Sequence, residues 1–418
     1  MKRAKSLLIV LLLISTLFVV QYVFILPNVS GTIKELWNSS RKKVIAPADY
    51  VNMGHIDRVI STNNTISSII HAESENEETY EERLEKKERL RLHFLETLVQ
   101  QQKENTKNGG GNDRVLILYP IFSGLGNNMA VLAEAILVSF LTNRRFYLYK
   151  WNSFDKYFSL PFNDYIYDDD AFLKSDYIGS DETCHNTPEE ILHSTKQFVV
   201  LRTTCKLTDY ICFNEEFWPF LDRNGFILHP HLKSGADIRK TVYSFLYNQV
   251  IKLQPDIAEG VIAVKKKLHW DDYYIIGIQI RTGKLGIKDA PNHFLEVRDI
   301  DLFSRYALIQ TEKAMNMTTK PVKWYVACDN RMVKAKLSKT YPKYFMTNSC
   351  TLSHSNKDLE RNVRSSGLLC ALYDSYLLSA VDEAIITAKS TFGILAVNRS
   401  PRMKRIQIMK GDWKKLKE

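Results

Sequence analysis

"RVLILYPIFSGLGNNMAVLAEAILVSFLTNRRFYLY", residues 114–149, runs a short apolar strand into a glycine-containing turn and then directly into an apolar helix. The turn holds Gly124 and Gly126 on either side of a leucine, and Asn127 follows. Glycines allow a tight turn and a close approach of the backbone to a ligand, and the amides that begin a helix form an anion site. A short turn also contains glycine for purely geometric reasons, so this motif needs support from the rest of the chain.

The same alternation of strand and helix continues along the chain. Short apolar runs predict strands at 115–119, 145–149, 197–201, 225–228, 273–280, 322–327 and 384–387. Longer periodic runs predict helices at 128–141, 236–253, 256–268, 301–315, 331–339, 364–378 and 392–398. Such alternation is typical of parallel sheets covered by helices on both faces. Because the body is longer than one such sheet needs, we predict two Rossmann-like lobes, an N-terminal acceptor-side lobe at 113–262 and a C-terminal lobe at 263–418.

The N-terminus resembles a membrane anchor. A basic tail at residues 1–5 precedes a charge-free apolar run at residues 6–26. A helix of about 20 apolar residues spans a bilayer, whereas the apolar part of a cleaved signal peptide has about 7–15. We therefore predict a cytoplasmic tail, a signal anchor at 6–26 that holds the protein in the membrane, and a lumenal body. A signal peptide cleaved near residues 29–31 is the alternative.

A lumenal body is expected to carry glycans and disulfides. The sequence contains Asn-X-Ser/Thr acceptors at Asn28, Asn38, Asn63, Asn316 and Asn398. Its six cysteines suit an oxidising compartment, and Cys205 with Cys212 is the pairing we expect. No cysteine or histidine spacing predicts a metal site. The net charge of +10 suits an anionic small substrate or the membrane surface, and a lumenal location excludes nucleic acid as the partner.

A stem is predicted between the anchor and the body, at residues 27–112. Its second half, "ESENEETYEERLEKKERLRLHFLETLVQQQKENTK" at 73–107, alternates acids and bases and predicts a long exposed helix with a broken apolar stripe. The glycines at 109–111 then form a flexible joint. We therefore expect that removal of residues 1–112 leaves a soluble and active body.

Three segments place polar residues where predicted strands end, which is where open parallel sheets bind ligands. Arg281 follows the apolar run at 275–280, and its guanidinium can hold phosphate in a bidentate manner or pair with a carboxylate. Lys389, Ser390, Thr391, Phe392 and Gly393 form a strand-to-helix turn that suits a diphosphate or provides an ordinary helix cap. Asp329 and Asn330 follow a third strand, positioned to cap the next helix or to bind a base or ribose, and capping is the use that we expect.

These segments resemble a known family. "SGLGNNMAVLAEAILVSFLTNR", "IGIQIRTG" and "AKSTFGILAV" are similar to conserved segments of the GDP-fucose-dependent fucosyltransferase superfamily, most closely of the plant xyloglucan type. The segment "CFNEEFWPF" resembles the family's aromatic acceptor-side segment. The resemblance covers most of residues 114–400 in order and stops before the stem. Where many relatives have histidine, this chain has Gln279, and Thr282 replaces a frequent charged residue.

The resemblance implies a GT-B architecture, in which two Rossmann-like lobes face a cleft, and transfer of fucose from GDP-fucose to a glycan hydroxyl with inversion and without a metal or cofactor. It also implies a Golgi membrane protein of single-pass type II, which could pair as a homodimer. Arg281 and Asn127 are the expected catalytic residues. The expected donor-binding residues are Gly124, Gly126, Asn127, Arg281, Asp329, Lys389, Ser390, Thr391, Phe392 and Gly393.

Three other functions fit parts of the sequence. Asp168, Asp169 and Asp170 form an acidic cluster of the kind that holds Mn²⁺ in metal-dependent transferases. A lumenal sulfotransferase would need a basic residue in the turn at 124–127, which has none. A non-catalytic glycan-binding or nucleotide-binding protein on the same fold is the alternative from a different class.

Overall fold

The computed structural model describes residues 79–107, 114–120, 124–151, 153–175, 177–180, 186–202, 206–228, 234–283, 295–296, 298–349, 366–400 and 403–412. All of them belong to one compact unit, residues 78–418. The predicted tail, signal anchor and first half of the stem lie outside the described residues. Within the described ranges, no helix combines the length and apolar character needed to cross a bilayer.

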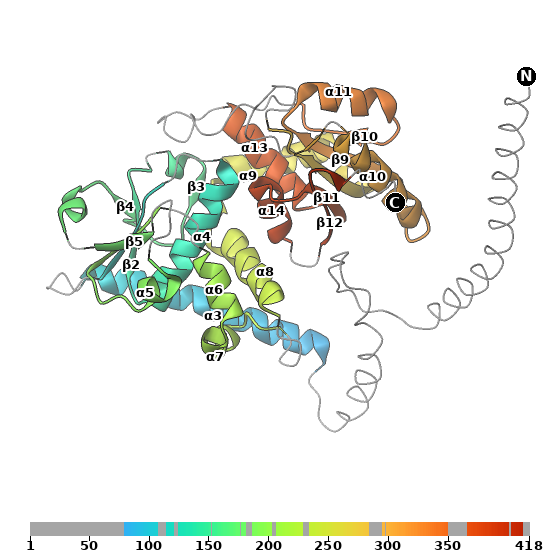
Figure 1. The fold of residues 1–418 in the computed structure, drawn as a ribbon. Helices are drawn as coiled ribbons and strands as arrows, with labels where there is room; N and C mark the ends of the chain where they lie inside the picture. Colours follow the sequence, from blue (N-terminus) through green and yellow to red (C-terminus); the bar gives the residue numbers. More distant parts are fainter. Residues whose placement is uncertain are drawn as a thin grey trace, which may run out of the picture. The chain divides into compact units, whose positions relative to one another are not determined.

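The first sheet is parallel throughout, in the order β4-β2-β1-β6-β5 (Figure 1). Its strands are β1 (Val115–Leu118), β2 (Arg145–Tyr149), β4 (Ile166–Tyr167), β5 (Tyr177–Ser180) and β6 (Phe198–Leu201). A short antiparallel pair, β3 (Phe158–Ser159) and β7 (Lys252–Leu253), lies outside both large sheets.

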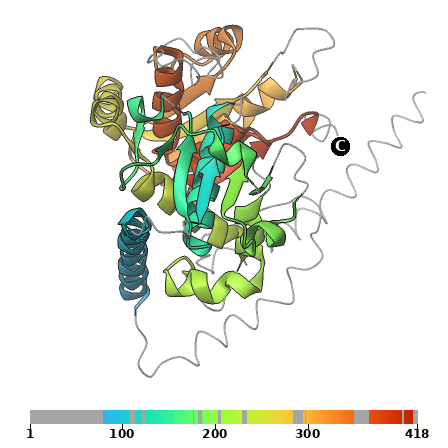
Figure 2. The ribbon, with the colours of Figure 1, turned by 90° about the vertical axis from the view of Figure 1, so that its left-hand side faces the viewer.

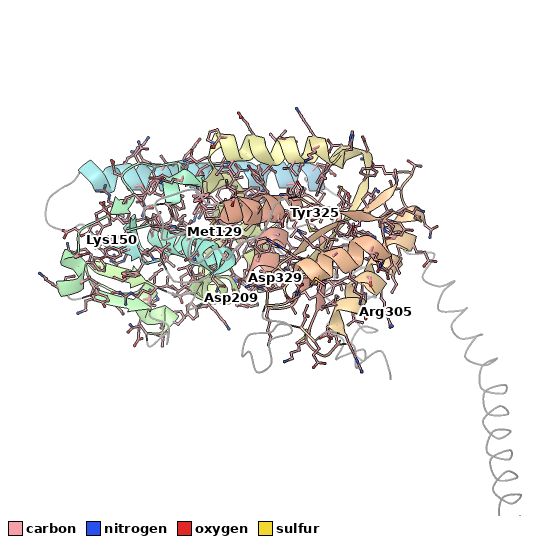
Figure 3. The ribbon with its side chains drawn as sticks, turned by 90° about the horizontal axis from the view of Figure 1, so that it is seen from above. Met129, Lys150, Asp209, Arg305, Tyr325 and Asp329 are labelled. Carbon is pink, nitrogen blue, oxygen red and sulfur yellow. The ribbon has the colours of Figure 1, made fainter. Side chains whose placement is uncertain are left out.

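The second sheet is also parallel, in the order β10-β9-β8-β11-β12. Its strands are β8 (Tyr274–Ile280), β9 (Val322–Cys328), β10 (Phe345–Met346), β11 (Glu383–Thr387) and β12 (Lys404–Ile408). The two sheets thus repeat one design, as the alternating sequence pattern predicted. Figure 3 labels Lys150, which follows β2 of the first sheet, and Asp329, which follows β9 of the second.

Helices connect the strands. The α-helices are α3 (Tyr80–Lys107), α4 (Leu125–Leu141), α5 (Pro188–Leu192), α6 (Leu207–Phe213), α7 (Trp218–Arg223), α8 (Gly235–Phe245), α9 (Pro255–Lys267), α10 (Asp299–Met315), α11 (Arg331–Thr340), α13 (Ser366–Leu378) and α14 (Thr391–Asn398). Single turns are η1 (Phe154–Lys156), η2 (Ala171–Lys174), η3 (Glu215–Phe217), η4 (Leu246–Val250) and η5 (Trp270–Asp272). The apolar α4 is buried over most of its length, which explains why its sequence lacks a polar face.

The central strands were predicted correctly, whereas several edge strands were missed. β4, β5, β10 and β12 lie toward the edges of their sheets, and two of them have only two residues, too few for a periodic signal. The strand predicted at 225–228 is wrong. Gly225 has a φ of +77° at the end of α7, and Phe226 and Ile227 are buried in the core without joining a sheet.

The charged helix of the predicted stem exists as α3, but it is not an exposed spacer. Phe94 and Leu98 are fully buried in the core of the first sheet, and Phe94 contacts the rings of Phe140 and Phe226. Lys87 forms an ion pair with Asp222 at 2.7 Å. The broken apolar stripe is therefore a packing face, and its partners lie far along the chain, where helix periodicity alone could not reveal them.

The cysteines differ from the expected pairing. Cys212 and Cys328 are buried free thiols, so the predicted pair of Cys205 with Cys212 is wrong. Cys212 lies on α6 inside the hydrophobic core, where burial raises the pKa of its thiol. Cys370 forms a disulfide whose partner cysteine lies outside the described residues.

Two of the predicted glycosylation acceptors lie in described segments. Asn316 is exposed just after α10, where a glycan could be attached. Asn398 is buried in the last turn of α14, and its side-chain oxygen accepts a hydrogen bond from Arg405 at 3.5 Å. A glycan on Asn398 would require that turn to open. The other three acceptors lie outside the described residues.

Candidate functional site

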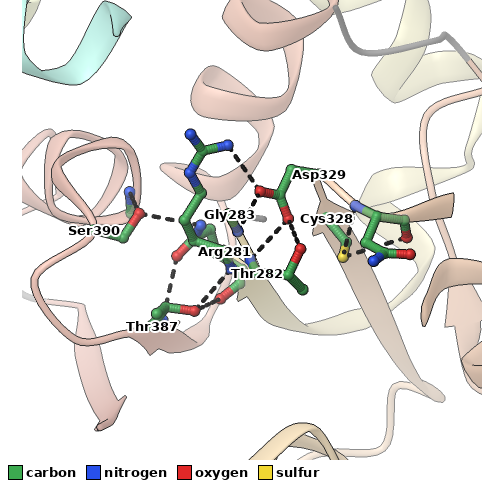
Figure 4. A network of polar contacts seen from close by, with 10 residues as sticks. Arg281, Thr282, Gly283, Cys328, Asp329, Thr387 and Ser390 are labelled. Carbon is green, nitrogen blue, oxygen red and sulfur yellow. Dashed lines mark hydrogen bonds and ion pairs between the residues drawn. The ribbon is translucent and has the colours of Figure 1, made fainter. Parts of the chain in front are cut away.

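The site lies at the carboxyl edge of the second sheet. β8 is flanked by β9 and β11, and all three run parallel, so their last residues meet at one edge. Arg281 follows β8, Asp329 follows β9, and Thr387 ends β11. Figure 4 shows these three residues together with Ser390 in one network of polar contacts. Ligands of open parallel sheets bind at this edge.

Arg281 is half-buried and paired with a carboxylate. Its Nη1 atom donates to Oδ2 of Asp329 at 2.8 Å, and its backbone amide donates to Oγ1 of Thr387, also at 2.8 Å. About a third of its side chain remains exposed (35%), against 17% for Asp329. A guanidinium fixed in this way keeps its charge and part of its surface for an anion that arrives from solvent.

Asp329 organises the turn after β8. Its carboxylate accepts hydrogen bonds from the amide and hydroxyl of Thr282, at 2.8 and 2.9 Å, and from the amide of Gly283 at 3.0 Å, in addition to Arg281. Asn330 caps α11 instead, because its Oδ1 atom accepts from the amides of Met332 and Val333. The capping expected of Asp329 and Asn330 is therefore confirmed for Asn330 and wrong for Asp329. This carboxylate positions Arg281 and the turn.

Gln279 joins the two halves of the site and was not among the predicted site residues. Its Nε2 atom donates to the hydroxyl of Ser390 at 3.3 Å, and its Oε1 atom accepts from the amide of Thr387 at 3.2 Å. A buried amide in an otherwise apolar strand was the signal that could have identified it. A β-carbon at Gly393 would lie 2.5 Å from the same Oε1 atom, so a larger residue there would displace the Gln279 side chain.

The turn after β11 presents a helix N-terminus to this edge. Ser390 is buried and caps α14, since its hydroxyl accepts from the amide of Gly393 at 3.4 Å. Lys389 adopts a φ of +62°, which turns the chain sharply before the helix. The amides of Thr391 and Phe392 have no hydrogen-bond partner within the described part of the chain. Ser390 therefore supports the turn, and the two amides are the donors at this helix start that its cap does not use.

A second helix N-terminus meets the first. Gly126, in the first turn of α4, lies against α14: a β-carbon there would be 2.5 Å from the carbonyl carbon of Thr391 and 2.6 Å from the amide nitrogen of Phe392. Gly126 thus serves the approach of two helices, and its assignment to the donor site stays a prediction. Asn127, beside it, is half-buried. Because both helices begin at this contact, their positive ends favour the same anion.

The two glycines of the turn are predicted to respond differently to substitution. Gly126→Ala forces a side chain into the backbone of α14, and overpacking of this kind costs about 1–3 kcal/mol. Gly124→Ala is the matched control, since nothing lies within 4 Å of its would-be β-carbon and its φ is −65°. We expect a lower Tm for the first variant only. Equal Tm values for the two variants would contradict the helix contact.

Asp329→Asn tests the positioning of Arg281. The substitution removes the negative charge beside Arg281. It also places an amide N–H₂ donor against groups that themselves donate, and leaving such buried groups unsatisfied lowers the free energy of unfolding by about 1–3 kcal/mol. We expect a lower Tm and an increased Kd for GDP in calorimetry. Asp209→Asn is the control, because Asp209 forms a similar ion pair with Arg239 at 2.9 Å, with side chains 34% and 31% exposed. If Asp209→Asn increased the Kd by the same amount, the claim that Asp329 positions Arg281 for binding would be contradicted.

The acidic cluster after β4 belongs to the first sheet. Asp170 pairs with Lys150 at 2.7 Å and accepts a hydrogen bond from the hydroxyl of Tyr149. In the described ranges, no three His, Cys, Asp or Glu side chains gather where they could hold a metal ion.

Comparisons with known proteins identify solved structures that share this fold. No protein-family model and no curated protein sequence matches the chain. Among solved structures, an arginine-to-lysine mutant of Arabidopsis thaliana FUT1 in complex with GDP superposes with a TM-score of 0.53, at 17% identity, over 76% of this chain and 78% of that one. The NodZ alpha-1,6-fucosyltransferase of Bradyrhizobium, co-crystallised with GDP, reaches a TM-score of 0.41 at 16% identity, over 68% and 92% of the two chains. The chain therefore shares the fold of FUT1, a xyloglucan fucosyltransferase.

Proposed function

We propose that this protein is a glycosyltransferase that moves fucose from GDP-fucose to a hydroxyl of a glycan. The observation that carries the proposal is that Arg281 and the start of α14 lie at the same edge of the second sheet. The Arg281 amide bonds to Thr387, Gln279 bonds to Ser390, and the first turn of α4 contacts α14 at Thr391. One fixed cation and two helix N-termini suit a diphosphate. The diphosphate is the leaving group of a nucleotide sugar, and it gains negative charge when the bond to the sugar breaks. The fold shared with a structure that binds GDP supports a guanosine nucleotide.

The proposed reaction needs charge stabilisation at the diphosphate. The bond between the sugar's anomeric carbon and the β-phosphate oxygen breaks, and its electron pair stays on the oxygen. Arg281 and the amides of Thr391 and Phe392 stabilise the charge that develops there. The acceptor hydroxyl forms the new bond from the opposite face of the sugar and releases its proton to solvent water, so the anomeric configuration inverts. Because Arg281 is permanently charged, the proposal requires no metal ion.

The proposed location is the Golgi membrane, with the body in the lumen. Support comes from the sequence: the basic residues 1–5, the apolar run at 6–26 and the exposed glycan acceptor Asn316. Treatment of the expressed protein with a glycan-removing enzyme should increase its gel mobility. Full cytoplasmic exposure in a protease-protection assay would contradict this location.

A donor screen tests the proposed function. Full-length protein in detergent is incubated with GDP-fucose, GDP-mannose or a UDP-sugar and a panel of oligosaccharide acceptors, each with and without excess EDTA. We expect transfer from GDP-fucose that persists in EDTA. Transfer that stops in EDTA would favour a metal-dependent enzyme, and GDP binding without transfer to any acceptor would favour a non-catalytic binding protein.

A further inference from the structure

The amino edge of the second sheet, opposite the candidate site, is rich in lysine. Residues 265–267, in the last turn of α9, are all lysines, and the chain then passes through η5 into β8. Lys320 and Lys323 flank the start of β9, and Lys343 lies just before β10. Because β8, β9 and β10 are parallel neighbours, their starts meet at one edge. Figure 2 shows α9, in yellow at the upper left, on the outside of the molecule.

Contacts around η5 gather these lysines. The Nζ atom of Lys320 donates to the carbonyl of Asp271 in η5 at 2.8 Å. The Nζ atom of Lys323 donates to the carbonyl of Lys343 at 2.7 Å, and it lies 5.5 Å from the ring centroid of Tyr273, which follows η5. Since α9 leads directly into η5, the lysines of α9, β9 and the turn before β10 border one short segment.

This cluster has an excess of positive charge. Its six lysines lie beside the two carboxylates of η5, Asp271 and Asp272, and Asp272 lies 3.6 Å from His269. On the other side of β8, Glu383 at the start of β11 pairs with Lys404 at 4.0 Å. None of the six lysines forms an ion pair with a carboxylate from the described part of the chain. Their charge is therefore left for a partner of opposite sign.

The cationic residues of this edge are lysines throughout. The segments 261–275, 316–325 and 339–347 contain no arginine. A guanidinium is a rigid fork that suits one oriented anion, whereas a lysine ammonium is a point charge on a flexible stem. Point charges spread over α9, β9 and the turn before β10 suit negative groups that repeat along a chain, rather than a single phosphate.

We propose that this surface, the lysine edge, binds a linear acidic polysaccharide; it consists of Lys265, Lys266, Lys267, Lys320, Lys323 and Lys343. Such a polymer carries sulfate or carboxylate groups at regular intervals, each of which can meet one ammonium. Tyr273 and Tyr344 are half-buried beneath Lys323 and Lys343, and their rings add apolar surface for a sugar. An anionic membrane is the weaker candidate, because the anionic leaflet is cytoplasmic and the body is proposed to be lumenal.

The lysine edge is separate from the donor site. Arg281 follows the carboxyl end of β8, a strand of seven residues, whereas the lysine edge lies at its start. At about 3.3 Å per residue, the two ends are about 20 Å apart. A polysaccharide on the lysine edge therefore leaves Arg281 free for the nucleotide. The inference goes beyond the proposed function and does not depend on which sugar is transferred.

Binding to immobilised heparin, a sulfated polysaccharide, tests the inference. Full-length protein in detergent is applied to heparin and to dextran, a neutral polysaccharide, at several salt concentrations. We expect binding to heparin that weakens as salt is added, and no binding to dextran. A variant with Lys266→Gln, Lys267→Gln and Lys343→Gln, all exposed, should show a Kd about three- to hundredfold higher, because three exposed ion pairs are lost. Its Tm and its Kd for GDP should not change.

The matched control carries Lys103→Gln, Lys174→Gln and Lys196→Gln, which remove the same charge from exposed positions on α3, on η2 and before β6. It should change the Kd for heparin by less than about twofold. Equal weakening in the two variants would overturn the inference, since net charge alone would then explain the binding. Wild-type protein that does not bind heparin would also overturn it. Water-soluble short-chain phosphatidylserine that binds at the lysine edge in the absence of heparin binding would assign the surface to a membrane.

Discussion

Arg281→Ala is expected to leave a folded protein that has lost nearly all transfer activity. Removal of one group that stabilises developing charge typically costs about 10²–10³ in rate, so less than about a tenth of the activity should remain. The loss should appear in kcat, because the charge on the diphosphate grows as the bond breaks. Single-turnover transfer from GDP-fucose, with a circular dichroism spectrum of the variant, measures both points.

Two further variants separate charge from structure. Arg281→Lys keeps the positive charge but loses the fork geometry, so it should retain more activity than alanine and less than wild type. Arg239→Ala removes an arginine of similar exposure, also paired with a carboxylate at 2.9 Å, and should transfer normally. An Arg281→Ala enzyme with more than a tenth of wild-type activity would mean that Arg281 is a structural partner of Asp329 only.

Removal of α3 is expected to prevent folding of the body. The sequence predicted that residues 1–112 are dispensable, but Phe94 and Leu98 of α3 are fully buried. Truncation of a buried Phe to Ala alone costs about 3–5 kcal/mol, and a typical domain is stable by only about 5–15 kcal/mol. A chain that begins at residue 114 should therefore aggregate, whereas one that begins at residue 78, the start of the compact unit, should stay soluble.

Point variants on α3 test the same claim without truncation. Phe94→Ala should lower the Tm markedly in full-length protein, because its ring packs against Phe140, Phe226 and Phe245. Leu92→Ala, on the exposed side of the same helix, should change the Tm little. Similar melting of the two variants, or a soluble and active chain from residue 114, would return α3 to the role of a spacer.

The sequence predicted the central strands and their ends well, because long apolar runs identify strands that are buried on both faces. Arg281 was identified in this way, and the structure brings it next to Ser390 through Gln279. The pairing of Arg281 with Asp329, 48 positions away, depends on which strands are neighbours, and local pattern does not contain that information. The sequence could therefore locate the residues at the carboxyl edge of the second sheet, but not the contacts between them.

Gly126 and α3 show a second limit of sequence analysis. A glycine that lets a ligand approach and a glycine that lets a helix approach have the same local sequence, and at Gly126 the neighbour is the backbone of α14. The apolar stripe of α3 is too broken to indicate burial by periodicity, because most of its other positions are charged. Its partners, Phe226 and Phe245, come from distant segments. In both cases the tertiary neighbour decides the role of the residue.

A structure of the full chain with GDP bound tests the central claim most directly. The account predicts that the diphosphate lies within hydrogen-bonding distance of the Arg281 guanidinium and of the backbone amides of Thr391 and Phe392, at the contact between α4 and α14. A diphosphate bound elsewhere, with the start of α14 unoccupied and Arg281 in contact with Asp329 alone, would contradict it.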